Sequence, residues 1–251
     1  MCCFTGPVSS VDNTRIFARW LAGAKPPRQV IAYQMDFKAK RGLAMVLPLP
    51  VPPDSGEKAV EFLNLEKAPD FFKRLHALFP EPASAGSFSR APGTDQAKPK
   101  KLEVVKVGSF EASFVPSLAD FGRLDERFRM GKGVWEQLPQ YKDWGFAVFK
   151  LRPDTTTVHP MAFSFPNSLP GSGLFFPTVH IHDGRVHPEE EFDHTLFCQV
   201  PSGRHGPSGW QESEKWASSV GKIEDAGLLD RSAHVYRKFL SGKLPNRDTW
   251  A

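Results

Sequence analysis

The chain has 251 residues, a net charge of +4 and 24% charged residues, which is ordinary for a globular protein of this size. So small a basic excess, dispersed along the chain, does not predict nucleic-acid binding. No apolar run approaches the roughly 20 residues of a membrane span, so we expect a cytoplasmic protein that does not span a membrane. Three cysteines, two of them adjacent, do not form a disulfide framework. The high counts of 21 Phe and 23 Pro favour aromatic strands and extended loops.

The N-terminus starts with Met followed by Cys2 and Cys3. If the Met is removed, the Cys2 thiol lies beside its own α-amino group, whose pKa of about 7.7–8.0 suits a base. This start resembles the N-terminal-nucleophile hydrolases, such as glutamine amidotransferases and choloylglycine hydrolases. The resemblance implies amide hydrolysis by Cys2, with Asn13, Arg15 or Arg19 lining the site. The alternative is a buried pair of small apolar residues.

Alternating apolar residues predict strands in the first part of the chain. In VIAYQMDFK, Ile31, Tyr33, Met35 and Phe37 alternate with more polar neighbours, which is typical of a half-buried strand. The same reasoning, with continuous apolar runs read as buried strands, predicts strands at 14–18, 29–38, 43–47, 102–107, 109–115, 144–151, 158–165 and 192–200.

Four features of the first eighty or so residues are similar to an uncharacterised family of bacterial proteins. They are the cysteine near the start, the RIFAR strand, the QVIAYQM strand and the AMVLPLPVPP run. The resemblance implies a bacterial protein with a β-rich N-terminal part. It implies no activity and no catalytic residues, and relatives of that kind often look exported.

Three regions are expected to be helical, near 57–79, 117–141 and 210–241. The stretch 81–101 is rich in Pro, Ala, Ser, Gly and Lys and predicts a flexible, linker-like insertion. Together these elements predict an α+β fold, mainly an antiparallel β-sandwich or curled sheet with helices packed at its ends or on one face. We expect a single domain spanning residues 1–251.

A group of histidines surrounds Asp183-Gly184, a dipeptide that favours a two-residue hairpin turn. In that register His180 and His182 share one face of the first strand, and His187 lies directly opposite His180. Three imidazoles on one face predict a site for a divalent transition metal, either Zn, Fe or Cu.

His194, on the strand that follows, is a candidate fourth ligand. In a metal-dependent enzyme Glu190, from the acidic run at 189–191, is the candidate catalytic acid or base. The substrate, a small molecule or a peptide, is not specified by the sequence. The alternatives are a solvated histidine-rich hairpin, hydrolysis by Cys2, and a non-catalytic binding module that uses an exposed Phe- and Pro-rich surface.

Overall fold

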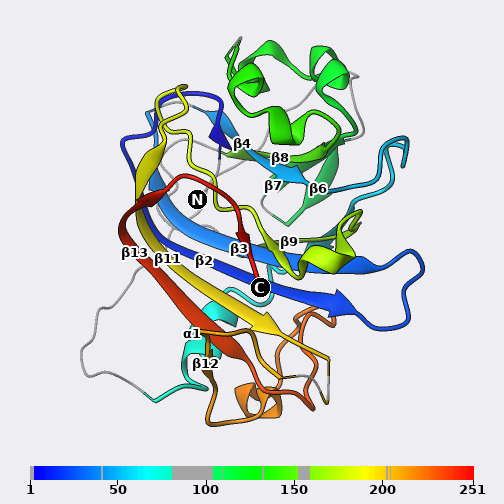
Figure 1. Ribbon diagram of the computed structural model, residues 1–251, viewed down its shortest axis with the longest axis vertical. Coiled ribbons are helices and arrows are strands. Elements are labelled where there is room, and N and C mark those ends of the chain that lie inside the picture. Colours follow the sequence, from blue (N-terminus) through cyan, green and yellow to red (C-terminus); the bar gives the residue numbers. More distant parts are fainter. Residues whose placement is uncertain are drawn as a thin grey trace.

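The structure is a computed structural model that describes residues 3–40, 42–80, 104–108, 110–131, 133–151, 159–201, 203 and 205–251. Two β-sheets packed face to face form the centre of this part of the chain, and each is covered on its outer side by short helices and loops (Figure 1). No helix among the described residues is long and apolar enough to span a membrane.

The larger sheet has seven strands, and their order is β12-β13-β11-β2-β3-β9-β5. All neighbouring pairs are antiparallel except β11 and β2, which are parallel. The bounds are β12 (Gln211–Glu212), β13 (Tyr236–Pro245), β11 (Glu189–Gln199), β2 (Ser10–Leu21), β3 (Arg28–Lys38), β9 (Met161–Pro166) and β5 (Glu61–Asn64).

The smaller sheet has five antiparallel strands in the order β1-β4-β8-β7-β6. Their bounds are β1 (Cys3–Phe4), β4 (Leu43–Leu49), β8 (Gly145–Leu151), β7 (Phe110–Val115) and β6 (Val105–Val107). A third, two-stranded sheet pairs β10 (Phe175–Phe176) with β14 (Thr249–Trp250), so the C-terminal residues lie beside the segment that leads to the histidines.

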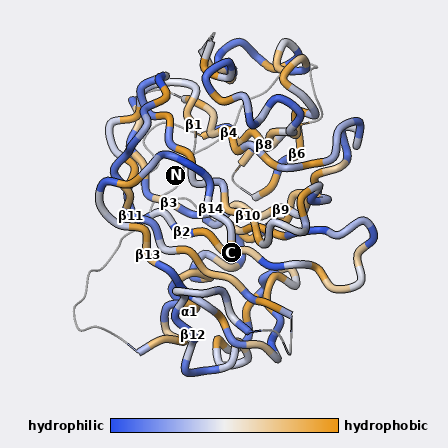
Figure 2. Tube along the Cα trace, in the orientation of Figure 1, coloured by the Kyte–Doolittle hydropathy of each residue, from blue (hydrophilic) through white to orange (hydrophobic). Residues whose placement is uncertain are grey.

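The period-two pattern of β3 separates two cores. Tyr33 and Met35 belong to the core that the two large sheets share, which also contains Met45 of β4. Val30 and Ala32 point to the opposite face, into a second core. Both faces of β3 carry apolar side chains, because each face packs against another layer of the protein. Figure 2 shows the hydrophobic stretches of the central strands and the more hydrophilic loops around them.

Short helices cover the outer faces. The α-helix α1 (Phe71–His76) and the 3₁₀ helix η6 (Ala217–Val220) pack on the larger sheet. The outer face of the smaller sheet packs against residues from the region that holds four 3₁₀ helices. These are η1 (Leu118–Arg123), η2 (Glu126–Phe128), η3 (Trp135–Gln137) and η4 (Pro139–Tyr141); η5 (Pro170–Ser172) precedes β10.

The predicted α+β class is wrong, because the protein is mostly β and α1 is the one α-helix in the described chain. The largest error is at 236–241, the end of a region expected to be helical, because these residues belong to the strand β13. This strand pairs with β11 over ten residues, and that long-range pairing overrides local helix preference. Similarly, 61–64 forms β5 against β9.

The strands predicted at 14–18, 29–38, 43–47 and 144–151 are confirmed by β2, β3, β4 and β8. The linker predicted at 81–101 lies outside the described residues and remains a prediction, as does the single-domain organisation.

Candidate metal-binding site

The segment around Asp183-Gly184 does not form the predicted hairpin. Its only bridge in the described chain is a parallel one between Ile181 and Cys3, and the amide of Phe4 donates to the Ile181 carbonyl at 3.0 Å. Gly184 does take a positive φ of 82°, but the Asp183 carboxylate accepts the amide of Arg185 at 3.0 Å. The turn is therefore held by a side chain.

Residues near the C-terminus hold this segment in place. Asn246 Oδ1 accepts the amide of His180 at 2.7 Å, and its Nδ2 donates to the carbonyls of His180 and His187, each at 2.9 Å. Asp248 accepts the amide of Thr178 at 2.9 Å. The Asn246 side chain thus fixes the backbone on both sides of the turn.

Three histidines form a cluster between the sheets. The Nε2 atoms of His180 and His194 lie 3.4 Å apart, and their rings are stacked with centroids 5.0 Å apart. The ring of His182 stacks on that of His180 at 5.3 Å. The aromatic rings of Phe192 and Phe4 contact the cluster at 4.2 Å from His180 and 5.9 Å from His182.

Two other predicted site residues lie away from this cluster. His187, expected opposite His180, instead points to Asp183, whose Oδ2 lies 3.1 Å from its Nε2. Glu190 is on β11 four residues before His194, which is roughly 13 Å along a strand, and its register partner is Leu244.

Of the two N-terminal cysteines, the structure describes Cys3 only. Cys2 lies outside the described residues, so its proposed chemistry remains a prediction. Cys3 is fully buried in β1.

Burial controls the charge of the histidines. It lowers the pKa of His180 and of His194 well below the usual value, and it lowers the pKa of His182 to about 4. All three are therefore neutral near pH 7, as metal ligands must be. Two of their nitrogens, His180 Nδ1 and His182 Nε2, are buried without a hydrogen-bond partner among the described residues.

A buried carboxyl lies on the same C-terminal segment. Asp248 accepts hydrogen bonds from the Tyr141 hydroxyl at 2.6 Å and from the amides of Thr178 and Val179. Burial raises the pKa of Asp248 to about 6, although these hydrogen bonds act to lower it. Burial likewise raises the pKa of the Tyr141 phenol, so this hydroxyl remains protonated and donates.

The histidine cluster has two nitrogens, rather than three, at the spacing of metal ligands. Nitrogens bound at about 2.0–2.1 Å to a tetrahedral Zn²⁺ are about 3.4 Å apart, which is the spacing of His180 and His194. Within the described chain, however, no set of three His, Cys, Asp or Glu side chains is arranged to hold a metal ion. Asp193 Oδ1 is 4.0 Å from His194 Nδ1, which is too long for a hydrogen bond.

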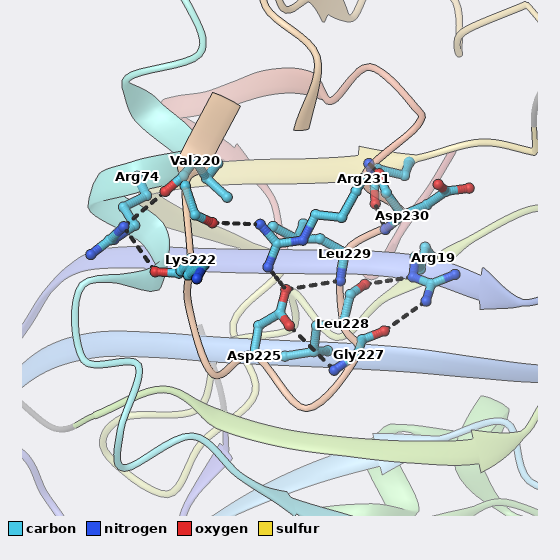
Figure 3. Close-up of polar contacts among 12 residues, drawn as sticks. Arg19, Arg74, Val220, Lys222, Asp225, Gly227, Leu228, Leu229, Asp230 and Arg231 are labelled. Atoms are coloured by element: carbon cyan, nitrogen blue, oxygen red, sulfur yellow. Dashed lines mark hydrogen bonds and ion pairs between the residues drawn. The ribbon is translucent and has the colours of Figure 1, made fainter. Parts of the chain in front are cut away.

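Arg19 has a structural role that differs from the predicted one. Its guanidinium donates to the carbonyls of Gly227 and Leu228 on the outer side of the larger sheet (Figure 3). Arg15 lies on the same outer face, whereas Cys3 belongs to the smaller sheet. The arginines are thus separated from the N-terminal strand by the larger sheet.

Sequence reasoning treated His194 as an optional ligand, yet it is one half of the closest imidazole pair. It also missed Asn246 and Asp248. Their contacts are formed across 66 and 70 positions of the chain, so no local pattern indicates them.

Comparisons with known proteins add little to this geometry. No protein-family model and no curated protein matches the chain. The crystal structure of baculovirus P35 is similar with a TM-score of 0.48 and 13% identity, over 99% of this chain and 98% of that one. A mutated baculovirus P35 after caspase cleavage is similar with a TM-score of 0.47 and 13% identity, over 95% and 98%. Similarity at this level assigns neither a shared fold nor a shared function.

Proposed function

We propose that this protein binds a divalent transition metal ion, such as Zn²⁺, Fe²⁺ or Cu²⁺, through the Nε2 atoms of His180 and His194. The observation that supports the proposal is the 3.4 Å separation of these two buried nitrogens. Imidazole is a ligand that all three ions accept. The same separation also fits a hydrogen bond between two neutral imidazoles, so the experiment must distinguish the two.

His182 is the proposed third ligand. Its ring stacks on His180, and its Nε2 has no hydrogen-bond partner among the described residues. Bringing this nitrogen to a shared ion requires a rotation of the side chain. His182 is partly exposed, whereas His180 and His194 are buried, so it has the most room to rotate.

The geometry supports metal binding more than metal-dependent catalysis. Glu190, the expected proton-transfer residue, makes no described contact with the imidazoles, and the Asp248 carboxylate is engaged by Tyr141 and Thr178. A bound ion would supply Lewis acidity, but the described residues place no general base beside it.

The test is metal analysis of purified protein combined with Co²⁺ titration. Tetrahedral nitrogen coordination of Co²⁺ gives visible absorption bands, which a hydrogen-bonded imidazole pair does not give. We expect His180→Ala and His194→Ala to abolish the bands and His182→Ala to weaken binding.

His187→Ala is the matched control, because this histidine is adjacent in sequence but points to Asp183. It should bind Co²⁺ as the parent does. If the parent shows no bands, or if His187→Ala loses them while His194→Ala retains them, the proposed site is wrong.

A second candidate function is a non-catalytic binding module. The supporting observation is the exposure of two large aromatic side chains on the surface, Phe239 at 56% and Trp216 at 53%. Exposed aromatic residues are enriched where proteins bind partners. Loss of partner binding in Phe239→Ser, with metal binding unchanged, would favour this candidate.

A further inference from the structure

Among the described residues, the outer face of the larger sheet is partly exposed beyond the end of α1. Phe197 of β11 lies on this face, and the ring of His76, the last residue of α1, packs edge-on against it at 4.9 Å. The neighbouring positions on the same face are more exposed: Thr195 is partly buried and Phe239 is 56% exposed. Positively charged side chains gather around this part of the face.

Arg237 lies on one side of Phe197, its register partner. Its guanidinium stacks between the rings of Phe79 and Phe239, at 4.2 and 4.9 Å from their centroids. The residue is only 6% exposed. Its one hydrogen bond in the described chain goes to the neutral amide of Gln211, and its Nε is buried without a partner there.

Arg15 lies on the other side. It pairs with Thr195, which in turn pairs with Phe239, so its side chain shares the outer face. Within the described chain Arg15 makes no hydrogen bond or ion pair. The carboxylates of Asp36 and Asp193, which act on it electrostatically, accept hydrogen bonds from Asn13 instead.

Two other arginines on this side of the sheet each bond a carboxylate and at least one backbone carbonyl. Arg74 donates to the Asp70 carboxylate. Figure 3 shows that Arg74 also donates to the carbonyls of Val220 and Lys222, and that Arg231 donates to Asp225. Arg231 donates to the Gly221 carbonyl as well. A guanidinium has five N–H donors, and burying them without acceptors costs free energy. Arg15 and Arg237 therefore have more unused donors than Arg74 and Arg231, and neither is bonded to a carboxylate in the described chain.

The positive charges of Arg15 and Arg237 affect the pKa of His76. Burial, together with smaller effects of the positive charges of Arg15 and Arg237, lowers the pKa of His76 to about 4. The two guanidiniums thus act electrostatically on one imidazole, which packs against Phe197. No carboxylate is bonded to any of the three in the described chain.

We propose that Arg15, His76 and Arg237 form a binding site for a dianionic oxyanion of the phosphate type. Two guanidiniums match its two negative charges, and their forked donors fit tetrahedral oxyanions. The imidazole of His76 adds a third donor. The exposed ring of Phe239 forms the rim, where an attached organic group would pack. This site is separate from the histidine cluster, which faces the other side of β11.

The test uses NMR on isotope-labelled full-length protein, with inorganic phosphate as the probe and sodium chloride at equal ionic strength as the reference. Phosphate should shift the ring signals of His76 and the Nε signals of Arg15 and Arg237 saturably. It should also raise the pKa of His76, because a bound anion stabilises the imidazolium. Succinate in place of phosphate tests whether a dicarboxylate is preferred.

Arg15→Gln should weaken phosphate binding by about tenfold or more, since it removes a charge-assisted bidentate contact. Arg237→Lys keeps the charge in the buried position and should bind weakly while remaining folded. Arg185→Gln, on an exposed turn, is the matched control and should bind as the parent does. If phosphate shifts no signal beyond chloride, or Arg15→Gln binds equally well, the site is refuted. Stronger binding of succinate would also overturn the phosphate assignment.

Discussion

Acid should destabilise this protein steeply in its metal-free form, because its histidine cluster is buried and neutral. Burial lowers the pKa values of His180, His182 and His194, so in the folded state these imidazoles take up protons only at a pH well below the usual histidine value. In the unfolded chain each imidazole titrates near pKa ~6.5. The stability that the neutral imidazoles contribute is therefore complete above about pH 6.5 and is lost as the pH falls below it.

The size of the effect follows from proton linkage. Between about pH 7 and pH 5.5 each such histidine lowers the free energy of unfolding by about 1.2 kcal/mol. His76, whose pKa is also lowered to about 4, makes four and brings the total to about 5 kcal/mol. Asp248 acts in the opposite direction. Its folded pKa of about 6 lies above the unfolded value, so its protonation returns about 0.8 kcal/mol over the same interval.

The expected net loss is about 4 kcal/mol, a large part of the ~5–15 kcal/mol that typical domains have. Urea unfolding followed by tryptophan fluorescence, in the presence of a chelator, measures it at the two pH values. His194→Gln should reduce the pH dependence by about 1.2 kcal/mol, because one titrating group is gone. His187→Gln is the control, since this side chain is partly exposed and points to Asp183. Equal unfolding midpoints at both pH values would refute the reasoning.

Three other outcomes are expected. Arg231→Gln should lower the free energy of unfolding by about 1–3 kcal/mol, because it leaves the buried Asp225 carboxylate with weaker partners; urea unfolding measures this. Asp248→Ala should be more destabilising than Asp248→Asn, since only Asn can still accept the Thr178 amide; equal losses of melting temperature would contradict that. Brief proteolysis should cut within 81–101 first, and mass spectrometry that locates the first cut inside β3 would disprove the predicted linker.

Strands with a clear alternation could be predicted from the sequence. In β3 the residues Ile31, Tyr33 and Met35 face the core between the sheets, and the same period places Val30 and Ala32 under α1. The alternation can be recognised in the sequence because each face of β3 packs in a different core. No pairing information was needed to recognise it.

The strand β13 shows why other elements were not predictable. The sequence YRKFLSGKLP has two lysines, a positive-φ Gly242 and no β-branched residue, so its local preference for a strand is weak. Its conformation is imposed by ten register pairs with β11, some 50 residues earlier in the sequence. Here tertiary pairing decides the structure, and the local pattern indicated a helix.

The candidate site was predicted in composition but not in geometry. The hairpin register placed His187 opposite His180, but the Asp183 carboxylate holds both the turn and the His187 ring. His194 takes the position beside His180 instead. The decisive contact is Asn246 binding the backbone of the histidine segment, and a side chain that far along the chain gives no local signal.

The strand β11 contributes side chains to both proposed sites, because its successive side chains point to opposite faces of the sheet. Residues with even numbers, including His194 and Leu196, point into the core between the sheets, and those with odd numbers, including Thr195 and Phe197, point to the outer face. Because successive side chains of a strand face opposite sides, one segment contributes to two chemically distinct sites. The inner site is largely buried and built from neutral imidazoles, which suits a metal ion. The outer site is half-open and holds two guanidiniums that are not bonded to a carboxylate in the described chain, which suits an anion. Since the sheet separates them, failure of one proposal leaves the evidence for the other unchanged.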